Sequence, residues 1–408
     1  MVVEVLNTGT ELLLGDVLNT HAAWFGKQLL ALDLSISRQT TVPDGEAIRS
    51  ALRESFSRAD VILVTGGLGP TTDDLTREIT ADLLGLELVA DAEVRRKIEA
   101  LVVERGSTMR VRMLRQTMIP RGATVLPNDF GSAPGLYLPG KESPRSPHLF
   151  LLPGPPREMQ PMFTASVLPL LKKLNGSVPH RECRIYRIVG MGESAVEECV
   201  GLGLSERGDL DVGYCARPNE VDLRLIGAPQ TLDEVEPKIL AAVGNHLFSR
   251  TAENLEDWVV TRLREQGRRV ATAESCSGGL LAHRLTNVPG ASEVFTHGFI
   301  VYSNEAKTAL LGVPQKMLED WGAVSEPVAR SLAEGALEKS GADFALSLTG
   351  IAGPGGGSTE KPLGLLFIGL ARRGKPTLCK NHLFPRDRET FKQLATQTAL
   401  DMLRHELL

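Results

Sequence analysis

The chain has 408 residues, of which 42% are hydrophobic and 23% charged, and its formal net charge is −5 at pH 7. This length and composition suit two or three globular domains, and the acidic balance provides no overall basic surface for nucleic acid. Five widely spaced cysteines without a CxxC pair argue against a disulfide framework or a zinc ribbon. No secretory signal pattern or apolar run of membrane-spanning length occurs, so we expect a soluble, cytoplasmic protein that does not bind membranes.

Strands and helices alternate through the first part of the chain. Residues 2–6, 35–41 and 60–65 are predicted to be strands, the last of them from its continuous apolar run, whereas residues 20–32 and 46–57 have helical apolar spacing. This alternation predicts a doubly wound α/β sheet, in which ligands bind outside the carboxyl ends of the strands.

A glycine-rich loop follows the strand at 60–65 and leads into a helix that we expect to begin at Thr71. The backbone N–H groups of such a loop can hold a phosphate, although the loop matches neither the GxGxxG fingerprint nor the Walker A motif. The candidate residues for binding a phosphate or nucleotide are Thr65, Gly66, Gly67, Gly69, Thr71 and Thr72.

Five acidic residues lie at predicted loop or helix-start positions, where they can hold a divalent cation against substrate phosphates. The candidate metal ligands are Glu11, Asp16, Asp44, Asp73 and Asp74. For Asp73 and Asp74 an equally weighted alternative is that they complement the dipole of the helix that they begin.

Residues 1 to about 165 resemble the molybdopterin-binding fold family, as found in the N-terminal domain of CinA (competence/damage-inducible) proteins. The matching blocks are Gly9-Thr10-Glu11-Leu12-Leu13 with Gly15 and Asn19, Pro43-Asp44, and the segments 65–74, 128–135 and 152–159. In molybdopterin proteins this fold binds a pterin phosphate. The resemblance associates the CinA version with metal-dependent ADP-ribose pyrophosphatase activity, and so implies ADP-ribose as a partner and a divalent metal, Mg or Co.

The stretch 91–115 is helical in pattern and strongly charged, which is typical of a solvated helix face. A minority alternative is that Arg110, Arg112 and Arg115 face a phosphate-bearing site. Residues 139–147 are expected to form an exposed, turn-rich loop between strands.

Residues 171–252 are expected to form a small α+β domain between the domains 1–170 and 253–408. CinA proteins carry a KH-like module at this position. Here the turn Gly190-Met191-Gly192-Glu193 lacks the GxxG sequence and bears an acid, which disfavours RNA binding. A spacer or dimerisation role is the expected one.

The last domain has three apolar runs that end in polar or glycine-rich loops. The first leads into Thr272-Ala273-Glu274-Ser275-Cys276-Ser277-Gly278-Gly279, a strand-to-helix turn with two hydroxyls and a thiol. Its serines either cap the following helix or provide a nucleophile, and free N–H groups at the helix start can bind an oxyanion. Lys307 is a candidate base, Tyr302 can position a proton, and the loop at 349–357 can bind an anion.

Residues from about 253 to 408 closely resemble the nicotinamide-mononucleotide deamidase domain of the CinA family. The matching blocks are AESCSGG at 273–279, YSNEAK at 302–307, GAVS at 322–325 and TGIAGP at 349–354, with serine at 277 where many members have threonine. The resemblance implies hydrolysis of the amide of nicotinamide mononucleotide to the acid and ammonia, and we expect no metal at this site.

On this basis Ser275 attacks the amide carbonyl, Lys307 accepts its proton and Tyr302 hydrogen-bonds within that pair. Ser277 and Ser303 are rival nucleophiles, whereas Cys276 is expected to be a small buried hydrophobe. The remaining candidates for contacts with the substrate or the oxyanion are Thr349, Gly278, Gly279, Gly350, Gly353, Gly355, Arg386 and Arg388.

Three functions stay open at this point. The first is a bifunctional enzyme of pyridine-nucleotide salvage, a pyrophosphatase followed by a deamidase, which we expect to be a homodimer. The second keeps the deamidase and makes the first domain a pterin- or nucleotide-binding module that senses without cleaving. The third is a non-enzymatic accessory protein of competence or DNA damage, which the acidic balance and the altered KH turn disfavour.

Overall fold

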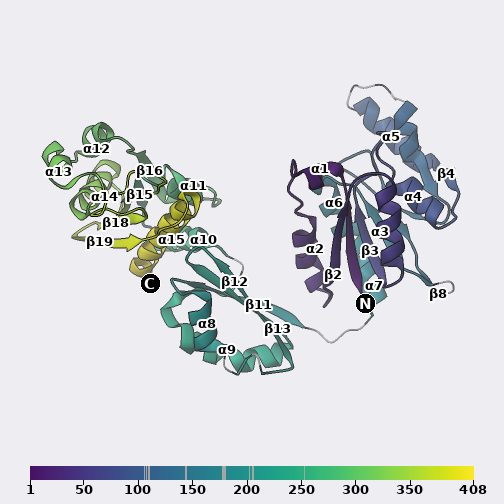
Figure 1. Ribbon diagram of the computed structural model, residues 1–408, viewed down its shortest axis with the longest axis horizontal. Helices are drawn as coiled ribbons and strands as arrows, with labels where there is room; N and C mark the ends of the chain where they lie inside the picture. The colour runs from purple at the N-terminus through teal and green to yellow at the C-terminus, as the bar shows by residue number, and fades with distance from the viewer. Residues whose placement is uncertain are drawn as a thin grey trace. The chain divides into compact units, whose positions relative to one another are not determined.

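The computed structural model describes residues 1–408 except 105, 107, 109, 110, 143, 144, 177–180, 202, 205 and 252. The chain forms two units, Met1–Arg181 and Glu182–Leu408 (Figure 1). Arg110, one of the predicted phosphate contacts, lies outside the described residues. Within the described part of the chain, no helix is both long and apolar enough to cross a bilayer.

Unit 1 is built on a six-stranded sheet. In sheet order its strands are β2 (Ile36–Val42), β1 (Val3–Thr8), β3 (Val61–Thr65), β10 (His148–Leu152), β7 (Gly135–Leu138) and β6 (Thr124–Leu126). The first four run parallel, and β7 and β6 are antiparallel to their neighbours. In β3, Val61 and Leu63 face one apolar core while Ile62 and Val64 face another. Burial on both faces explains the uninterrupted apolar run of this strand.

Helices cover both faces of this sheet, so the predicted doubly wound α/β fold is confirmed (Figure 1). One face packs against α2 (His21–Leu30), α6 (Pro156–Met162), the π-helix η2 (Phe163–Val167) and α7 (Leu168–Asn175). The other face packs against α3 (Glu46–Phe56), α4 (Thr76–Leu83) and α5 (Ala92–Glu104).

The shorter elements of unit 1 correct three details of the sequence analysis. Helix α4 begins at Thr76, so Asp73 and Asp74 precede it and do not lie in its first turn, and the dipole interpretation is wrong. Helix α5 ends at Glu104, and Arg115 belongs to the separate 3₁₀ turn η1 (Val111–Thr117). The expected loop at 139–147 contains a short strand pair. The remaining elements are α1 (Thr10–Leu14), β4 (Leu88–Ala90), β5 (Met118–Pro120), β8 (Lys141–Glu142) and β9 (Arg145–Ser146).

The first part of unit 2 is an antiparallel sheet with two helices. In sheet order the strands are β12 (Leu210–Arg217), β13 (Glu220–Gly227), β11 (Glu182–Val189) and β14 (Leu247–Ser249). Helices α8 (Glu193–Val200) and α9 (Pro229–Val243) pack on one face of this sheet. The residues of β11 and β13 in that core are Tyr186, Ile188, Val221, Leu223 and Leu225. This is the small α+β domain that the sequence predicts.

The rest of unit 2 is a second α/β sheet. Its strands, in sheet order, are β16 (Phe295–Ile300), β15 (Val270–Glu274), β17 (Phe344–Gly350), β18 (Leu365–Arg372) and β19 (Lys375–Leu383). The first three are parallel, and the last two are antiparallel. One face packs against α10 (Leu255–Glu265), α11 (Leu280–Thr286) and α15 (Arg388–Leu407). The other packs against α12 (Asn304–Leu311), α13 (Gln315–Trp321) and α14 (Glu326–Ser340); two 3₁₀ turns, η3 (Gly244–His246) and η4 (Ala291–Glu293), complete the unit.

The two parts of unit 2 share buried contacts. Val189 and Phe248 of the small domain belong to the apolar core under α10 and α15. Gln397 of α15 donates a hydrogen bond to the buried Glu220 carboxylate at 2.8 Å. These contacts explain why the two sequence domains form one structural unit.

Candidate functional site

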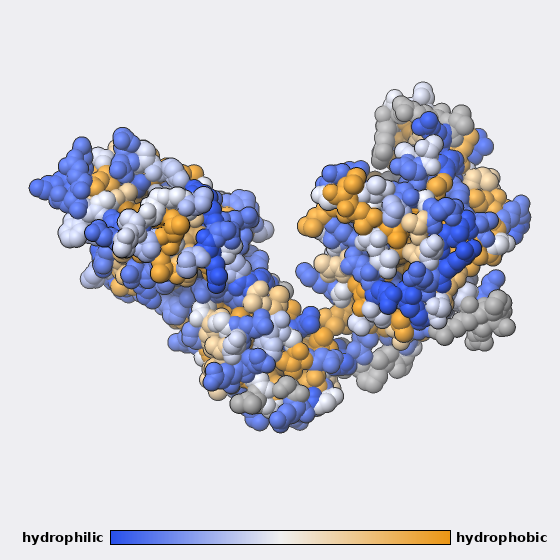
Figure 2. Space-filling view, viewed as in Figure 1, coloured by the Kyte–Doolittle hydropathy of each residue, from blue (hydrophilic) through white to orange (hydrophobic). Residues whose placement is uncertain are grey.

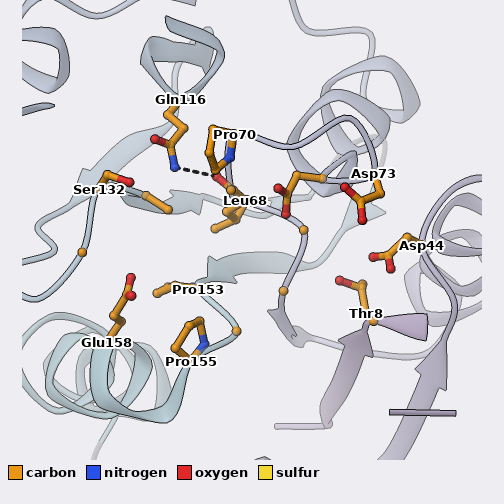
Figure 3. Close-up of a pocket in the computed structure, with 18 of the residues that line it drawn as sticks. Thr8, Asp44, Leu68, Pro70, Asp73, Gln116, Ser132, Pro153, Pro155 and Glu158 are labelled. Carbon is orange, nitrogen blue, oxygen red and sulfur yellow. Dashed lines mark hydrogen bonds between the residues drawn. The ribbon is translucent and has the colours of Figure 1, made fainter. Parts of the chain in front are cut away.

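A cavity of about 380 Å³ opens in unit 1 where β1, β3 and β10 end (Figure 3). Gly66, Gly67 and Gly69 line it, as expected for a glycine-rich loop at the carboxyl edge of a parallel sheet. A Cβ on Gly66 would lie 2.4 Å from the carbonyl oxygen of Thr8, and one on Gly67 would lie 2.1 Å from Thr76 Oγ1. Both glycines also have positive φ, so the close approach of this loop to its neighbours requires glycine.

The hydroxyl-bearing residues predicted for the same loop do not line the cavity. The structure instead directs Thr65 inward, where it is buried and its Oγ1 accepts a hydrogen bond from Asn7 Nδ2 at 2.6 Å. Thr71 and Thr72 are exposed beside the cavity. The backbone of the glycines is therefore the part of the predicted phosphate loop that faces a ligand.

Four of the five predicted metal ligands line this cavity. They are Glu11, Asp44, Asp73 and Asp74, and Asp44 and Asp73 point into the same end of it in Figure 3. Asp16 does not line it. Across the described residues, no three acidic, histidine or cysteine side chains are placed to hold a metal ion by themselves. The donors fit a cation held by one or two carboxylates together with ligand phosphates, which is how Mg²⁺ is usually bound.

Backbone groups fix two of these carboxylates. Asp44 Oδ2 accepts from the N–H of Thr10 at 3.1 Å, and Asp74 Oδ2 accepts from the N–H of Thr71 at 2.8 Å. Arg115 braces the same loop, because its guanidinium donates to the carbonyls of Thr71 at 2.6 Å and Asp74 at 3.2 Å. Arg115 therefore supports the loop and, contrary to the minority expectation, does not line the cavity.

The cavity is also lined by residues to which the sequence analysis gave no role. They are Gln116, Phe130, Ser132, Arg157 and Glu158. Arg157 and Glu158 lie in the block 152–159 of the family resemblance. Glu158 could have been recognised from the sequence, because it is a charged residue at a helix position that packs inward. Arg157 is the basic residue among the lining side chains.

A buried histidine supports the floor of the cavity. His21 Nδ1 lies 3.1 Å from Thr65 Oγ1, and its ring also hydrogen-bonds the backbone of Gly154, which lines the cavity. Burial lowers the pKa of His21 below its usual value of 6.5. At neutral pH the ring is therefore uncharged and links two loops of the site.

An exposed apolar surface adjoins the cavity on and after α1 (Figure 2). Its side chains are Leu13, Leu14, Val17 and Leu18, which are 51% to 84% exposed. Glu11 of the same helix lines the cavity, so one rim of the site is apolar.

In unit 2, the three predicted loops meet at one edge of the second sheet. Glu274 at the end of β15 pairs with Ile300 at the end of β16, and the N–H of Val301 donates to the Glu274 carbonyl at 2.8 Å. On the other side, the N–H of Ser275 donates to the Leu348 carbonyl of β17 at 2.9 Å. The parallel arrangement of the strands thus brings these distant segments together.

The start of α11 is capped by Glu274, contrary to the expectation that a serine caps it or that its N–H groups are free. The buried carboxylate of Glu274 accepts from the N–H groups of Gly279 at 3.0 Å, Leu281 at 3.0 Å and Ala282 at 2.8 Å. These amides are therefore not available to an oxyanion or a phosphate.

Burial separates the candidate nucleophiles. Ser275 is partly exposed, whereas Ser277 is fully buried and its Oγ has no hydrogen-bond partner within the described residues. Ser303 caps α12, because its Oγ accepts from the N–H of Ala306 at 3.1 Å. Burial raises the pKa of the Cys276 thiol to about 12, so the thiolate is scarce at neutral pH. Ser275 is the hydroxyl best placed to meet a substrate.

Lys307 is buried and surrounded by carbonyl oxygens. Its Nζ donates to Val301 O at 3.0 Å, Tyr302 O at 3.2 Å and Ser303 O at 3.4 Å. Burial lowers the pKa of Lys307 from its usual 10.5, and the acidic groups of the nearby Cys276 and Glu305 partly oppose this effect. As far as the chain is described, Lys307 Nζ makes no hydrogen bond to Ser275, so a proton transfer between them requires the ammonium head to move.

Arg388 connects two of the predicted segments. It donates to the hydroxyl of Tyr302 at 3.0 Å and to the carbonyl of Gly353 at 2.9 Å. Lys392, one helical turn further along α15, lies with Nζ 3.8 Å from where a Cβ of Gly278 would be. Sequence reasoning missed Lys392, although its spacing of four residues from Arg388 marks the same helix face.

The other predicted contacts are placed less directly. Thr349 is buried, and its hydroxyl donates to the carbonyl of Ala323 at 2.7 Å, which joins two of the family blocks. Gly350 ends β17, and Gly355 is exposed in the loop that follows. Arg386 is exposed, two residues before the Arg388 that makes these contacts.

Comparison with known proteins follows the same division of the chain. Residues 4–173 match a family model described as "Probable molybdopterin binding domain", residues 183–249 match "Damage-inducible protein CinA KH domain", and residues 252–407 match "CinA C-terminal domain". A CinA-like protein of Akkermansia muciniphila is 47% identical over 98% of this chain and 95% of its own length. A CinA-like protein of Dictyoglomus turgidum is 40% identical over 99% of both chains. A crystal structure of a competence/damage-inducible protein from Agrobacterium tumefaciens is 39% identical over 38% of this chain and 98% of that one, with a TM-score of 0.36.

Proposed function

This chain belongs to the CinA family, and from that premise we propose that its C-terminal domain hydrolyses the amide of nicotinamide mononucleotide. The observation that carries the proposal is the meeting of three loops at one sheet edge, with the partly exposed Ser275 between them. The products are nicotinate mononucleotide and ammonia.

In the proposed reaction, Ser275 Oγ forms a bond to the amide carbon, and the carbon–nitrogen bond then breaks. Lys307 accepts the hydroxyl proton and returns it to the departing nitrogen, so that ammonia leaves and an ester remains on Ser275. Water then cleaves this ester. The lowered pKa of Lys307 supports its role, since a base must lose its own proton before it can accept another.

The test is ammonia release from nicotinamide mononucleotide by the full chain in the presence of a metal chelator. We expect Ser275→Ala to lose more than about a thousandfold in rate, as enzymes do when they lose a nucleophile. Ser277→Ala is the matched control, because the Ser277 hydroxyl is fully buried, and we expect it to keep most of the activity. An active Ser275→Ala protein would contradict the assignment of the nucleophile.

For the N-terminal domain we propose metal-dependent cleavage of a pyrophosphate such as that of ADP-ribose. Five carboxylates and a single guanidinium, that of Arg157, line the cavity, so a phosphate entering alone meets strong repulsion. A bound divalent cation would neutralise this charge and polarise the phosphate oxygens. Asp44 and Asp73 would hold it, and the glycine loop would orient the phosphates.

The test is hydrolysis of ADP-ribose with and without Mg²⁺ or Co²⁺. We expect no reaction in chelator, and at least a roughly tenfold loss in Asp73→Asn, since that change removes a metal-binding carboxylate. Glu87→Gln, an exposed carboxylate paired with Arg121, is the control and retains full activity. Metal-dependent binding of ADP-ribose without cleavage would instead make the domain a binding module.

A further inference from the structure

The cavity of unit 1 has two chemically different ends. Asp44 and Asp73 point into one end, next to the glycine loop, whereas Gln116, Ser132 and Glu158 lie at the other (Figure 3). The proposed cation and phosphates account for the first end. The second end has no role in the pyrophosphatase chemistry proposed above.

Gln116 presents an acceptor without a partner at this second end. The side chain is fully buried, and its Nε2 donates to the carbonyl of Leu68 at 3.4 Å. A carbonyl can only accept, so this contact fixes the orientation of the amide and directs Oε1 away from Leu68. Among the described residues, Oε1 has no hydrogen-bond partner. Buried acceptors are rarely left unsatisfied, and one that lines a cavity indicates an absent donor.

Glu158 presents a second acceptor, held in place by its surroundings. It is nine-tenths buried, and its Oε2 accepts from Asn128 Nδ2 at 2.8 Å. The same Asn128 amide donates to the carbonyl of Ala133 at 2.7 Å. A Cβ on Gly131 would lie 1.9 Å from Glu158 Oε2, so the loop closes tightly around the carboxylate. The remaining lone pairs of this carboxylate are available to the cavity that it lines.

We propose that this end of the cavity binds a ligand group that carries two or more hydrogen-bond donors. Gln116 Oε1 and the Glu158 carboxylate accept from it. Phe130, whose N–H donates to the same Asn128 that holds Glu158, also lines the cavity and has an exposed apolar ring. The proposal rests on the nucleotide site of the proposed function. It adds the direction in which the ligand lies, with its phosphates at the Asp44 end and its hydrogen-bond donors at the Glu158 end.

Both outer parts of ADP-ribose have this chemistry. The terminal ribose carries hydroxyl donors, and the adenosine carries the hydroxyls of its own ribose together with the amino group of adenine. ADP keeps the adenosine and lacks the terminal ribose, so comparison of the two ligands identifies which part lies at the Glu158 end. Pyrophosphate has neither part and probes only the phosphate end.

The experiment is calorimetric titration of the full chain in Mg²⁺ with ADP, pyrophosphate and an analogue of ADP-ribose that has a methylene group between its two phosphorus atoms. Because the proposed activity cannot cleave this analogue, it reports the affinity for ADP-ribose. We expect Glu158→Gln and Gln116→Met to weaken the binding of ADP-ribose by roughly ten- to a hundredfold, the usual loss for hydrogen bonds to a buried or charged acceptor. Pyrophosphate should bind Gln116→Met as it binds the wild type. It should bind Glu158→Gln equally or more tightly, because that variant removes a negative charge.

In Glu158→Gln, ADP-ribose should bind more weakly while pyrophosphate binds equally or more tightly. This difference separates the loss of a hydrogen bond from a general change in charge. Glu99→Gln, an exposed carboxylate of α5, is the control and should leave every affinity unchanged. Thermal unfolding checks that each variant folds. Ser132→Ala tests the Glu158 end of the cavity without altering a buried group. Equal weakening of ADP-ribose and pyrophosphate, or no weakening of either, would overturn the proposal. Binding without cleavage would contradict the pyrophosphatase function and leave the donor site standing.

Discussion

At the scale of single residues, several side chains that we predicted to contact a substrate hydrogen-bond to the backbone instead. Thr349 donates to Ala323, and Ser303 caps a helix. His21, in contrast, had no predicted role in the site. In the structure its ring links Thr65 to the cavity loop at Gly154. Each assignment follows from contacts between residues far apart in the sequence.

The burial of His21 predicts how the stability of unit 1 depends on pH. Its pKa is lowered in the folded protein, so the unfolded chain takes up the proton first as the pH falls through 6.5. We therefore expect the stability of unit 1 to fall as the pH drops through about 6.5, and to level off once the pH is below the lowered pKa of the folded protein. In His21→Gln this loss should be smaller but not absent, since burial also lowers the pKa of His148 in the same unit.

The measurement is thermal unfolding followed by the fluorescence of Trp24, with Trp258 and Trp321 replaced by phenylalanine so that only unit 1 reports. His283→Gln, an exposed histidine of unit 2, is the control. An equally steep pH dependence in wild type and His21→Gln would show that His21 is not the group that titrates.

At the scale of elements, the turn between β15 and α11 shows how one carboxylate replaces the expected cap. Glu274 accepts hydrogen bonds from three N–H groups of the turn, and Ser275, the nucleophile that we propose, is its direct neighbour. The position of Ser275 thus depends on a buried acid rather than on the helix start alone.

We expect Glu274→Gln to destabilise unit 2 by about 1–3 kcal/mol, the usual cost of weakening hydrogen bonds to a buried charged group. Amide hydrolysis should fall as well, through kcat more than through KM, because the turn carries the attacking hydroxyl. The measurements are urea unfolding and steady-state kinetics, with Glu265→Gln on α10 as an exposed control. Unchanged kinetics in Glu274→Gln would mean that the turn keeps its geometry without the carboxylate.

At the scale of the whole molecule, the three domains of the sequence form two structural units. Val189 and Phe248 of the KH-like domain pack into the core of the C-terminal domain, and Gln397 hydrogen-bonds Glu220 across the same contact. The first unit, Met1–Arg181, has cores of its own.

We therefore expect calorimetry of the full chain to show two unfolding transitions, not three. The KH-like and C-terminal domains should unfold together, because they share a buried core. Gln397→Ala leaves the buried Glu220 without this partner. It should lower the unfolding temperature of unit 2 and leave that of unit 1 unchanged. Three separate transitions would show that the two domains of unit 2 are stable independently.

The sequence by itself determined the family, the doubly wound sheet and the segments that carry the candidate sites. Continuous apolar runs such as Val61–Thr65 fix buried parallel strands, and the glycine and serine blocks mark the loops that follow them. Within the small middle domain its patterns predict a strand at 184–189, a helix at 193–202 and a strand at 220–226, and they miss β12 and α9. Strand β12 is half exposed and lacks an apolar run, whereas α9 does carry apolar residues at helical spacing, so its signal was present.

Only the tertiary structure decided which side chains of those loops are accessible at the candidate sites. It buried Ser277 and left Ser275 partly exposed, turned Thr65 inward, and brought Gln116 and Glu158 to one cavity. The physical reason is that a buried polar group takes whichever partner the fold brings near, and those partners lie many residues away. Local patterns fix the elements, while the direction of each polar side chain depends on the packing of the whole domain.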